Sequence, residues 1–342
     1  MPLVPMRQVL EEAAKGNYGV GAFNVNNMEQ IQAIVDAAKE TKSPVIIQAS
    51  RGALKYSRMI YLRNLIMAAV EESPDIPIAM HLDHGNSLKT CKEAIALAFT
   101  SVMIDASLTE DGKTIASYEY NVKTTREVVE YAHNLGVTVE AELGALGGIE
   151  DGHGAGLRGD EHLTDPNQVE DFVRKTGCDA LAVAIGTSHG AYKTLRYDKD
   201  GKPLPPRLAL DRIEEIHKRV PHLLLVMHGS SSVPPELVNV VNQHGGSMKK
   251  TMGVPMADIQ FGIQRGVRKI NVDTDGRIAF TGAIRKYLAE HPEKFDPRDY
   301  LVPARDALRE LIKSKMVDFG QAGHAGDFKP MTLEDAKKNW YS

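Results

Sequence analysis

Short apolar runs alternate with amphipathic segments along the whole chain. Eight runs of nearly continuous hydrophobic residues are separated by stretches with helical periodicity. Continuous apolar runs are typical of parallel β-strands that are covered on both faces. The predicted strands are residues 18–25, 44–50, 76–83, 101–107, 137–144, 179–186, 223–229 and 267–275.

The segments between these strands carry helix start and stop signals. Asp165 and Pro166 suit the first turn of a helix over 166–177, and Gly136 suits the end of a helix over 114–136. Further helices are predicted over 27–41 and 87–99, and the N-terminal 19 residues form an amphipathic helix without a signal-peptide core. After the last strand we expect one helix and then an acidic-basic tail from about Asp299.

Strict alternation of strands and helices predicts an α/β fold with a parallel sheet and right-handed crossovers. Eight such units favour a closed (β/α)8 TIM barrel, with extra terminal helices, as one domain over residues 1–342. A doubly wound open sheet is the alternative. No GxGxxG or GxxxxGK[ST] motif follows the first strand, which disfavours a nucleotide-binding sheet.

Two longer stretches interrupt the alternation. Residues 147–163 are rich in glycine and charge, and residues 244–255 read HGGSMKKTMGVP. Loops of this length in a compact domain are commonly lids or binding loops, although plain surface loops are the alternative.

Composition narrows the possible functions. The chain has 342 residues, of which 42% are hydrophobic and 25% charged, with a net charge of -4 and two cysteines. The sequence lacks a basic patch of the kind that binds nucleic acid, and it has no apolar stretch long enough to span a membrane. The two cysteines do not form a CxxC pair. We therefore expect a cytoplasmic protein.

Three histidines stand where predicted strands run into loops that contain glycine or serine. They are His84, His189 and His228. In a TIM barrel the carboxyl ends of the strands meet at one mouth, which holds the active site. Three imidazoles around an open fourth position describe a catalytic zinc site, so we expect these residues to bind a metal.

Carboxylates accompany the histidines at the same strand ends. Asp83, next to His84, could coordinate a metal, orient a ligand or transfer protons. Asp105 and Glu142 could bind a second cation or support the first set of ligands, and salt bridges inside the barrel mouth are the alternative. The loops SHGAYK and HGSSS, with Lys193 and Arg277 nearby, favour an anion-binding site.

At these residues the chain resembles the class II, metal-dependent fructose-1,6-bisphosphate aldolases, and among them the type B branch. The resemblance covers nearly the whole chain and rests on GAFNVNN, PVIIQAS, HLDHG, ELGALGG, SHG, HGSS and VRKINVDTD. The combination of HLDHG, HGSS and NVDTD is specific, whereas each piece alone is not. Tagatose-bisphosphate aldolases share the architecture and the same motifs.

The resemblance implies a role for each matching residue. It implies that His84, His189 and His228 bind the catalytic zinc, and that Asp83 is the acid and base at the C4 hydroxyl. Glu150 matches a loop glutamate that transfers a proton at C3 of dihydroxyacetone phosphate, and Ile149 replaces the glutamate that precedes it in type A members.

The remaining matches concern further ions, the substrate and the assembly. Asp105 and Glu142 match a second divalent metal site, and a monovalent cation is implied as well. The substrate contacts implied for the triose phosphate, the hydroxyls and the distal phosphate are Gly190, Lys193, Gly229, Ser231, Asn271, Asp273, Thr274, Ser50 and Arg277. The family also implies a homodimer or homotetramer, in which the arginine can come from a neighbouring subunit.

Other functions make distinct predictions. A barrel metallohydrolase usually carries an HxH pair on its first strand, and GAFNVNN lacks one. A Schiff-base aldolase would use a lysine such as Lys269 in the last strand. A protein that only binds a metal or a sugar phosphate would need neither Asp83 nor Glu150.

Overall fold

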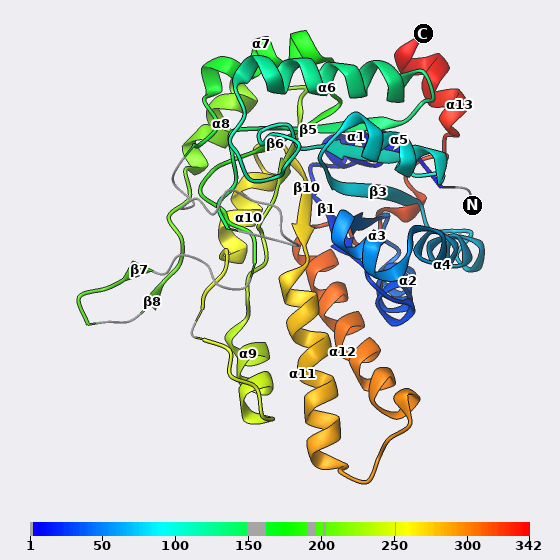
Figure 1. The fold of residues 1–342 in the computed structure, drawn as a ribbon, viewed down its shortest axis with the longest axis vertical. Helices are drawn as coiled ribbons and strands as arrows, with labels where there is room; N and C mark the ends of the chain where they lie inside the picture. Colours follow the sequence, from blue (N-terminus) through cyan, green and yellow to red (C-terminus); the bar gives the residue numbers. More distant parts are fainter. Residues whose placement is uncertain (1–2, 149–161, 191–195, 201–202, 250) are drawn as a thin grey trace.

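Eight parallel strands close into a barrel that helices surround (Figure 1). This computed structural model describes residues 3–148, 162–190, 196–200, 203–249 and 251–342. The barrel strands are β1 Val20–Asn24, β2 Val45–Ser50, β3 Ile78–Gly85, β4 Ser101–Ile104, β5 Thr138–Leu143, β6 Ala180–Val183, β9 Leu224–Met227 and β10 Val267–Val272. Their order around the barrel is β1-β10-β9-β6-β5-β4-β3-β2, with β2 returning to β1.

The predicted (β/α)8 barrel and its strands are thus confirmed, and the open sheet is excluded. Each observed strand lies inside the corresponding apolar run, except that β3 continues through His84 to Gly85. Strands β4, β6, β9 and β10 end two to three residues before the predicted runs, so Asp105, His228 and Asp273 follow their strands directly.

Helices follow the strands as the alternating pattern predicts. Those that cover or flank the barrel are α1 Met6–Gly16, α2 Met28–Thr41, α3 Arg51–Ser57, α4 Met59–Glu72, α5 Leu88–Ala96, α6 Tyr118–His133, α7 Pro166–Thr176, α8 Leu210–Arg219, α9 Pro235–Gln243 and α10 Met256–Ile263. The Asp165 side chain accepts a hydrogen bond from the Asn167 amide and Pro166 opens α7, as the sequence predicts. Among the described residues, no helix combines the length and apolar character needed to cross a membrane.

The part of the chain after β10 confirms the predicted extra terminal helices, which extend further than expected. Helices α11 Thr274–Glu290 and α12 Pro297–Asp318 form an antiparallel pair that projects from the barrel (Figure 1). The expected tail from about Asp299 is wrong, because α12 covers this region and is followed by the short segments η1 His324–Gly326, α13 Leu333–Ala336 and η2 Lys337–Tyr341. A small antiparallel hairpin of β7 Arg196–Tyr197 and β8 Pro203–Leu204 lies outside the barrel.

Two apolar layers hold the barrel together. The outer layer lies between the strands and the surrounding helices, whereas the inner layer fills the barrel from its amino-terminal end. Helix α1 supplies Met6, Val9 and Leu10 to the inner layer and closes that end. Polar side chains therefore collect at the opposite end, where the loops after the strands begin.

Candidate metal and substrate site

The three predicted metal ligands lie together at the carboxyl end of the barrel. His84 ends β3, His228 follows β9 directly, and His189 stands in the loop after β6. All three are buried, and one ring nitrogen from each lies within 4.8 Å of the others. His84 has a φ of 50°, a left-handed backbone that is uncommon for residues other than glycine and is often found at functional sites.

The ring nitrogens are arranged as metal ligands would be. Nε2 of His84 and Nδ1 of His228 face each other at 3.1 Å. The other nitrogen of each ring contacts a carboxylate, Asp105 at 3.2 Å from His84 Nδ1 and Glu140 at 2.7 Å from His228 Nε2. Carboxylates in this position fix the tautomer and aim the free nitrogen at an ion. The donor set and its geometry fit a zinc ion.

Electrostatics around His84 favour a positive charge. Burial would lower the pKa of this histidine, but the neighbouring Asp83 and Asp105 carboxylates outweigh burial and raise it to about 10. Burial lowers the pKa of His228 well below its ordinary value, and the charge of Lys269 adds to this effect. The His228 ring is therefore held neutral, whereas the carboxylates around His84 favour a positive charge at its side of the site.

A second group of possible ligands adjoins the first. Ligand atoms of His84, Asp105 and Glu142 lie within 4.8 Å of one another, and all three residues are buried. Burial, together with the charge of Asp105, raises the pKa of Glu142 well above its ordinary value. Glu142 Oε2 is buried and has no hydrogen-bond partner among the described residues. A cation bound here would relieve the burial of these two carboxylates.

Asp83 is held by three amide side chains. Its Oδ2 accepts hydrogen bonds from Asn24 Nδ2 at 2.9 Å and Gln48 Nε2 at 3.3 Å, and its Oδ1 accepts one from Asn271 Nδ2 at 3.3 Å. Burial alone would raise the pKa of Asp83, but the charge of neighbouring His84 and the hydrogen bond from Asn24 outweigh burial and lower it to about 2. Asp83 is therefore an oriented, ionised carboxylate whose Oδ1 lies 4.0 Å from His84 Nε2.

A pocket opens beside Asp83 and His189. Strand-end residues and the loops after β6 and β9 form its walls, and its lining residues are Asn24, Asp83, His189, Gly190, Gly229, Ser231, Asn271, Asp273 and Thr274. All except Asn24 are candidates that the sequence predicts. Thr274 also begins α11, so the N-terminus of a long helix faces the same space, an arrangement that favours anions.

Glycine is required where the two loops of the pocket meet. Gly229 has a φ of 60°, and a Cβ placed on it would lie 2.6 Å from the Ser188 carbonyl oxygen. The loop after β6 is in turn fixed to the loop after β5, because the His189 amide donates to the Gly147 carbonyl at 2.9 Å. The backbone around His189 and Gly229 is therefore closely packed.

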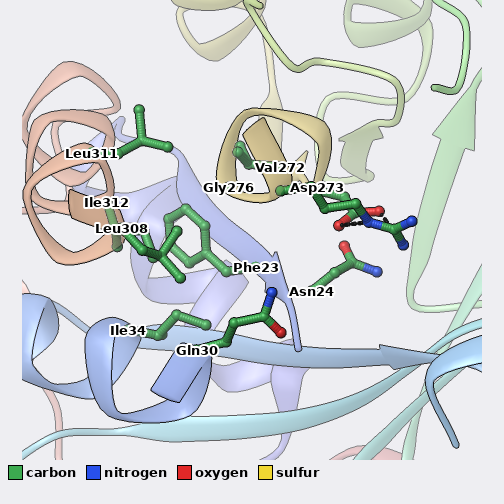
Figure 2. Close-up of a pocket in the computed structure, with 11 residues that line it drawn as sticks. Phe23, Asn24, Gln30, Ile34, Val272, Asp273, Gly276, Leu308, Leu311 and Ile312 are labelled. Atoms are coloured by element: carbon green, nitrogen blue, oxygen red, sulfur yellow. Dashed lines mark hydrogen bonds and ion pairs between the residues drawn. The ribbon is translucent and has the colours of Figure 1, made fainter. Parts of the chain in front are cut away.

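Two candidates lie beside the pocket rather than in it. Ser50 ends β2, and its Oγ accepts a hydrogen bond from the Ala53 amide as the N-cap of α3. Arg277 pairs with Asp273 through two contacts of 2.8 Å, and it lines a neighbouring pocket between β1, α2, α11 and α12. In that pocket Asn24 and Asp273 lie on the polar side, whereas Phe23, Ile34 and Leu308 form the apolar side (Figure 2). Glu150 and Lys193 lie outside the described residues.

Asn24, Gln48 and Glu140 belong to the mouth without a role predicted from the sequence, and Lys269 has only the alternative role of a Schiff-base lysine. Asn24 and Gln48 were missed as partners of Asp83, although each is a polar residue in an apolar run. Glu140 and Lys269 point into the barrel below His228, with the two charges 2.9 Å apart and fully buried. Lys269 is therefore ion-paired inside the barrel, and it is not among the residues that line the pocket.

Comparisons with known proteins agree with this geometry. The family model described as "Fructose-bisphosphate aldolase class-II" matches residues 4–324. The chain is 54% identical to a fructose-bisphosphate aldolase of Nostoc sp. over 98% of this chain and 94% of that one. It is 56% identical to a fructose-bisphosphate aldolase of Giardia intestinalis over the full length of both chains.

Solved structures show the same architecture. The crystal structure of the YdjI aldolase from Escherichia coli K12 superposes with a TM-score of 0.73 at 29% identity, over 95% of this chain and 100% of that one. The family model matches almost all of the sequence, and two relatives above half identity are covered over 94% and 100% of their length, so the chain belongs to the class II fructose-bisphosphate aldolase family.

Proposed function

We propose that this protein catalyses the reversible aldol cleavage of fructose 1,6-bisphosphate to dihydroxyacetone phosphate and glyceraldehyde 3-phosphate. The observation that carries the proposal is the oriented, ionised Asp83 beside three converging histidines, in a chain that belongs to this family. The enzyme is accordingly a lyase of central sugar metabolism.

The histidines His84, His189 and His228 would hold the catalytic metal, for which we propose zinc. When bound there, zinc would supply Lewis-acid stabilisation of the negative charge that develops on the substrate during cleavage. Each histidine would bind the ion as a neutral ring, with His84 giving up its proton on binding, so the ligands would leave the charge of the ion undiminished. The carboxylates Asp105 and Glu140 keep two of the rings in position.

Asp83 would remove the proton from the C4 hydroxyl during cleavage and return it during condensation. Its low pKa keeps it ionised at neutral pH, so it can accept this proton, and its three amide partners fix its direction. We assign proton transfer at C3 to Glu150, which lies outside the described residues.

The two phosphates and the hydroxyls would bind around the pocket. We assign the triose phosphate to Gly190, Lys193, Gly229 and Ser231, since three of them line the pocket next to His189. The hydroxyls and the phosphate would also contact Asn271, Asp273 and Thr274, which line the same pocket. Ser50 and Arg277 are proposed for the distal phosphate, and Arg277 would have to exchange its contact with Asp273 for the substrate.

Further ions and the assembly form the outer part of the proposal. The group of His84, Asp105 and Glu142 would take a second divalent metal, and a monovalent cation would accompany the substrate. The projecting α11–α12 pair, with Phe295 90% exposed at its tip, supports a homodimer or homotetramer. The two buried, reduced cysteines suit a cytoplasmic location. We further propose that residues 1–342 form a single domain.

Kinetics with metal analysis of the same sample test this function. We expect cleavage of fructose 1,6-bisphosphate to be faster than cleavage of tagatose 1,6-bisphosphate, and about one zinc ion per chain at the three histidines. A chelator should abolish turnover, and added zinc should restore it. Full turnover in a rigorously metal-free sample, or a covalent adduct after borohydride reduction with substrate, would contradict the metal-dependent mechanism.

A further inference from the structure

The loop after β9 has a backbone that needs external support. Val233, the last residue of the segment 229–233, has a φ of 46°, which is a strained conformation for a β-branched side chain. Asp275 holds it in place, because its carboxylate oxygens accept the amides of Ser232 at 2.9 Å and Val233 at 2.7 Å. The same loop carries Gly229 and Ser231, which line the pocket.

The Asp275 carboxylate, which supports this loop, is itself buried, and a lysine that is distant in the sequence neutralises its charge. Asp275 is fully buried, and Nζ of Lys315 lies 2.9 Å from its Oδ2. Lys315 also donates a hydrogen bond to Ser232 Oγ at 2.9 Å, and this lysine is only 4% exposed. A buried charge requires a partner, so Lys315 completes the support of the loop.

Lys315 is held firmly because it lies on α12. Leu308, Ile312 and Lys315 follow one another at helical spacing on one face of this helix. Leu308 and Ile312 pack beside Phe23 of β1 (Figure 2). The packed helix therefore fixes the position of Lys315, and the contacts of Lys315 in turn fix the loop.

A second loop, residues 253–254, also contacts this segment closely. The amides of Gly253 and Val254 donate to the Ser232 and Ser231 carbonyls at 3.2 Å and 3.1 Å. A Cβ at Gly253 would lie 2.1 Å from the Ser231 carbonyl oxygen, so this approach requires glycine. Residues 231–233 are thus held both by residues 253–254 and by the Asp275–Lys315 pair.

From these contacts we propose that Lys315 is a positioning residue for the phosphate-binding part of the pocket, acting through Asp275 and Ser232. The proposal rests on the function proposed above, in which Gly229 and Ser231 bind a substrate phosphate. Without Lys315, Asp275 would keep a buried, uncompensated negative charge behind a loop that must receive an anion. Repulsion of the phosphate and relaxation of the loop would both weaken substrate binding.

The test is Lys315→Met, which keeps most of the side-chain length and removes the charge. We expect KM for fructose 1,6-bisphosphate and the inhibition constant of inorganic phosphate each to rise about tenfold or more. We expect kcat to change by less than about threefold and the zinc content to stay the same, because the histidines and Asp83 are untouched. Lys313→Met on the same helix is the matched control, since its partners Glu40 and Glu310 are on the surface, and it should leave all these values unchanged.

The outcomes separate this inference from the proposed function. If the unsubstituted protein does not cleave the sugar, the proposed function fails. If it does, and Lys315→Met shows the original KM and phosphate inhibition, the inference alone is overturned. Where Lys315→Met does not fold, Ser232→Ala removes one contact of the lysine and leaves α12 intact. This variant should raise KM two- to threefold, because one hydrogen bond is lost. An unchanged KM in Ser232→Ala also overturns the inference.

Discussion

At the scale of single residues, charged side chains at the barrel mouth act through partners that fix them. Asp83 is surrounded by amides from three strands, and His228 is backed by Glu140, which Lys269 neutralises in turn. Each arrangement fixes the direction of the side chain by contacts on both of its polar atoms. Orientation, rather than the mere presence of a carboxylate or imidazole, distinguishes these residues from ordinary buried polar groups.

The role of Asp83 can be tested by Asp83→Asn, which keeps the shape of the side chain but not its basicity. We expect kcat to fall about 100-fold or more, because proton transfer of this kind contributes about 10²–10⁴ to the rate. Zinc content should be unchanged. Asp75→Asn, at an exposed loop position, should behave like the unsubstituted enzyme. A kcat within a few fold of the original in Asp83→Asn would remove this residue from the proton transfer.

Glu140→Gln tests the support behind the metal site. Glu140 Oε1 lies 2.7 Å from His228 Nε2, so the substitution weakens the hydrogen bond that orients this ring and leaves Lys269 without its counter-charge. We expect zinc affinity to fall about 10- to 100-fold, as is usual for partners of metal ligands. Competition with a chelator of known affinity measures this, with the exposed Glu334→Gln as control. Equal affinity in both variants would show that Glu140 has no such role.

The sequence predicted the residues at strand ends better than those inside the barrel. His84, His189 and His228 stand where apolar runs meet polar loops, so their common location follows once the barrel is assumed. Asn24 and Gln48 lie within apolar runs, and an isolated amide there reads equally well as a buried structural residue. Only the three-dimensional contact with Asp83 distinguishes the two readings.

At the scale of elements, the C-terminal part differs most from the sequence-based expectation. Helix α12 contains Pro303, and a proline inside a helix removes a backbone hydrogen bond and costs about 3 kcal/mol. Burial of Ala304, Leu308 and Ile312 against the barrel offsets this cost. Such compensation depends on packing with β1 and α2, so local sequence alone predicts a tail instead of a helix.

The end of the chain is fastened to the amino-terminal side of the barrel. Tyr341 donates a hydrogen bond to Asp179 Oδ1 at 2.9 Å and stacks on His133 with ring centroids 3.7 Å apart. Asp179, which directly precedes β6, also pairs with Arg7 of α1 at 3.2 Å. This cluster joins the first helix, the barrel and the last residues at the end opposite the metal site.

Tyr341→Phe should therefore affect stability and not catalysis. Loss of a hydrogen bond to a buried carboxylate is expected to lower the free energy of unfolding by about 1–3 kcal/mol. Denaturation in urea measures this loss, and kcat and KM should stay unchanged. Tyr56→Phe, at a side chain that is 78% exposed, provides the control and should leave stability unaltered. A changed KM in Tyr341→Phe would contradict the separation of the two barrel ends.

At the scale of the whole molecule, the barrel follows from the periodicity of the sequence. Eight apolar runs with helices between them allow few arrangements, because parallel strands need right-handed crossovers and buried faces on both sides. The sequence therefore predicts the topology of the barrel. It predicts less about the surface arms, since the direction of the α11–α12 pair depends on contacts between residues distant in the chain.

Because the site is assembled from strands all around the closed barrel, activity requires the whole barrel to be folded. The three histidines come from β3, the loop after β6 and the end of β9, and 144 residues separate the first from the last. Asn24 and Asn271, which hold Asp83 from both sides, come from the first and last barrel strands. No partly folded or proteolysed fragment lacking one of these units contains a complete site. In a refolding experiment, turnover should therefore return only when β1 pairs with β10 and closes the barrel. This return should come later than the recovery of secondary structure.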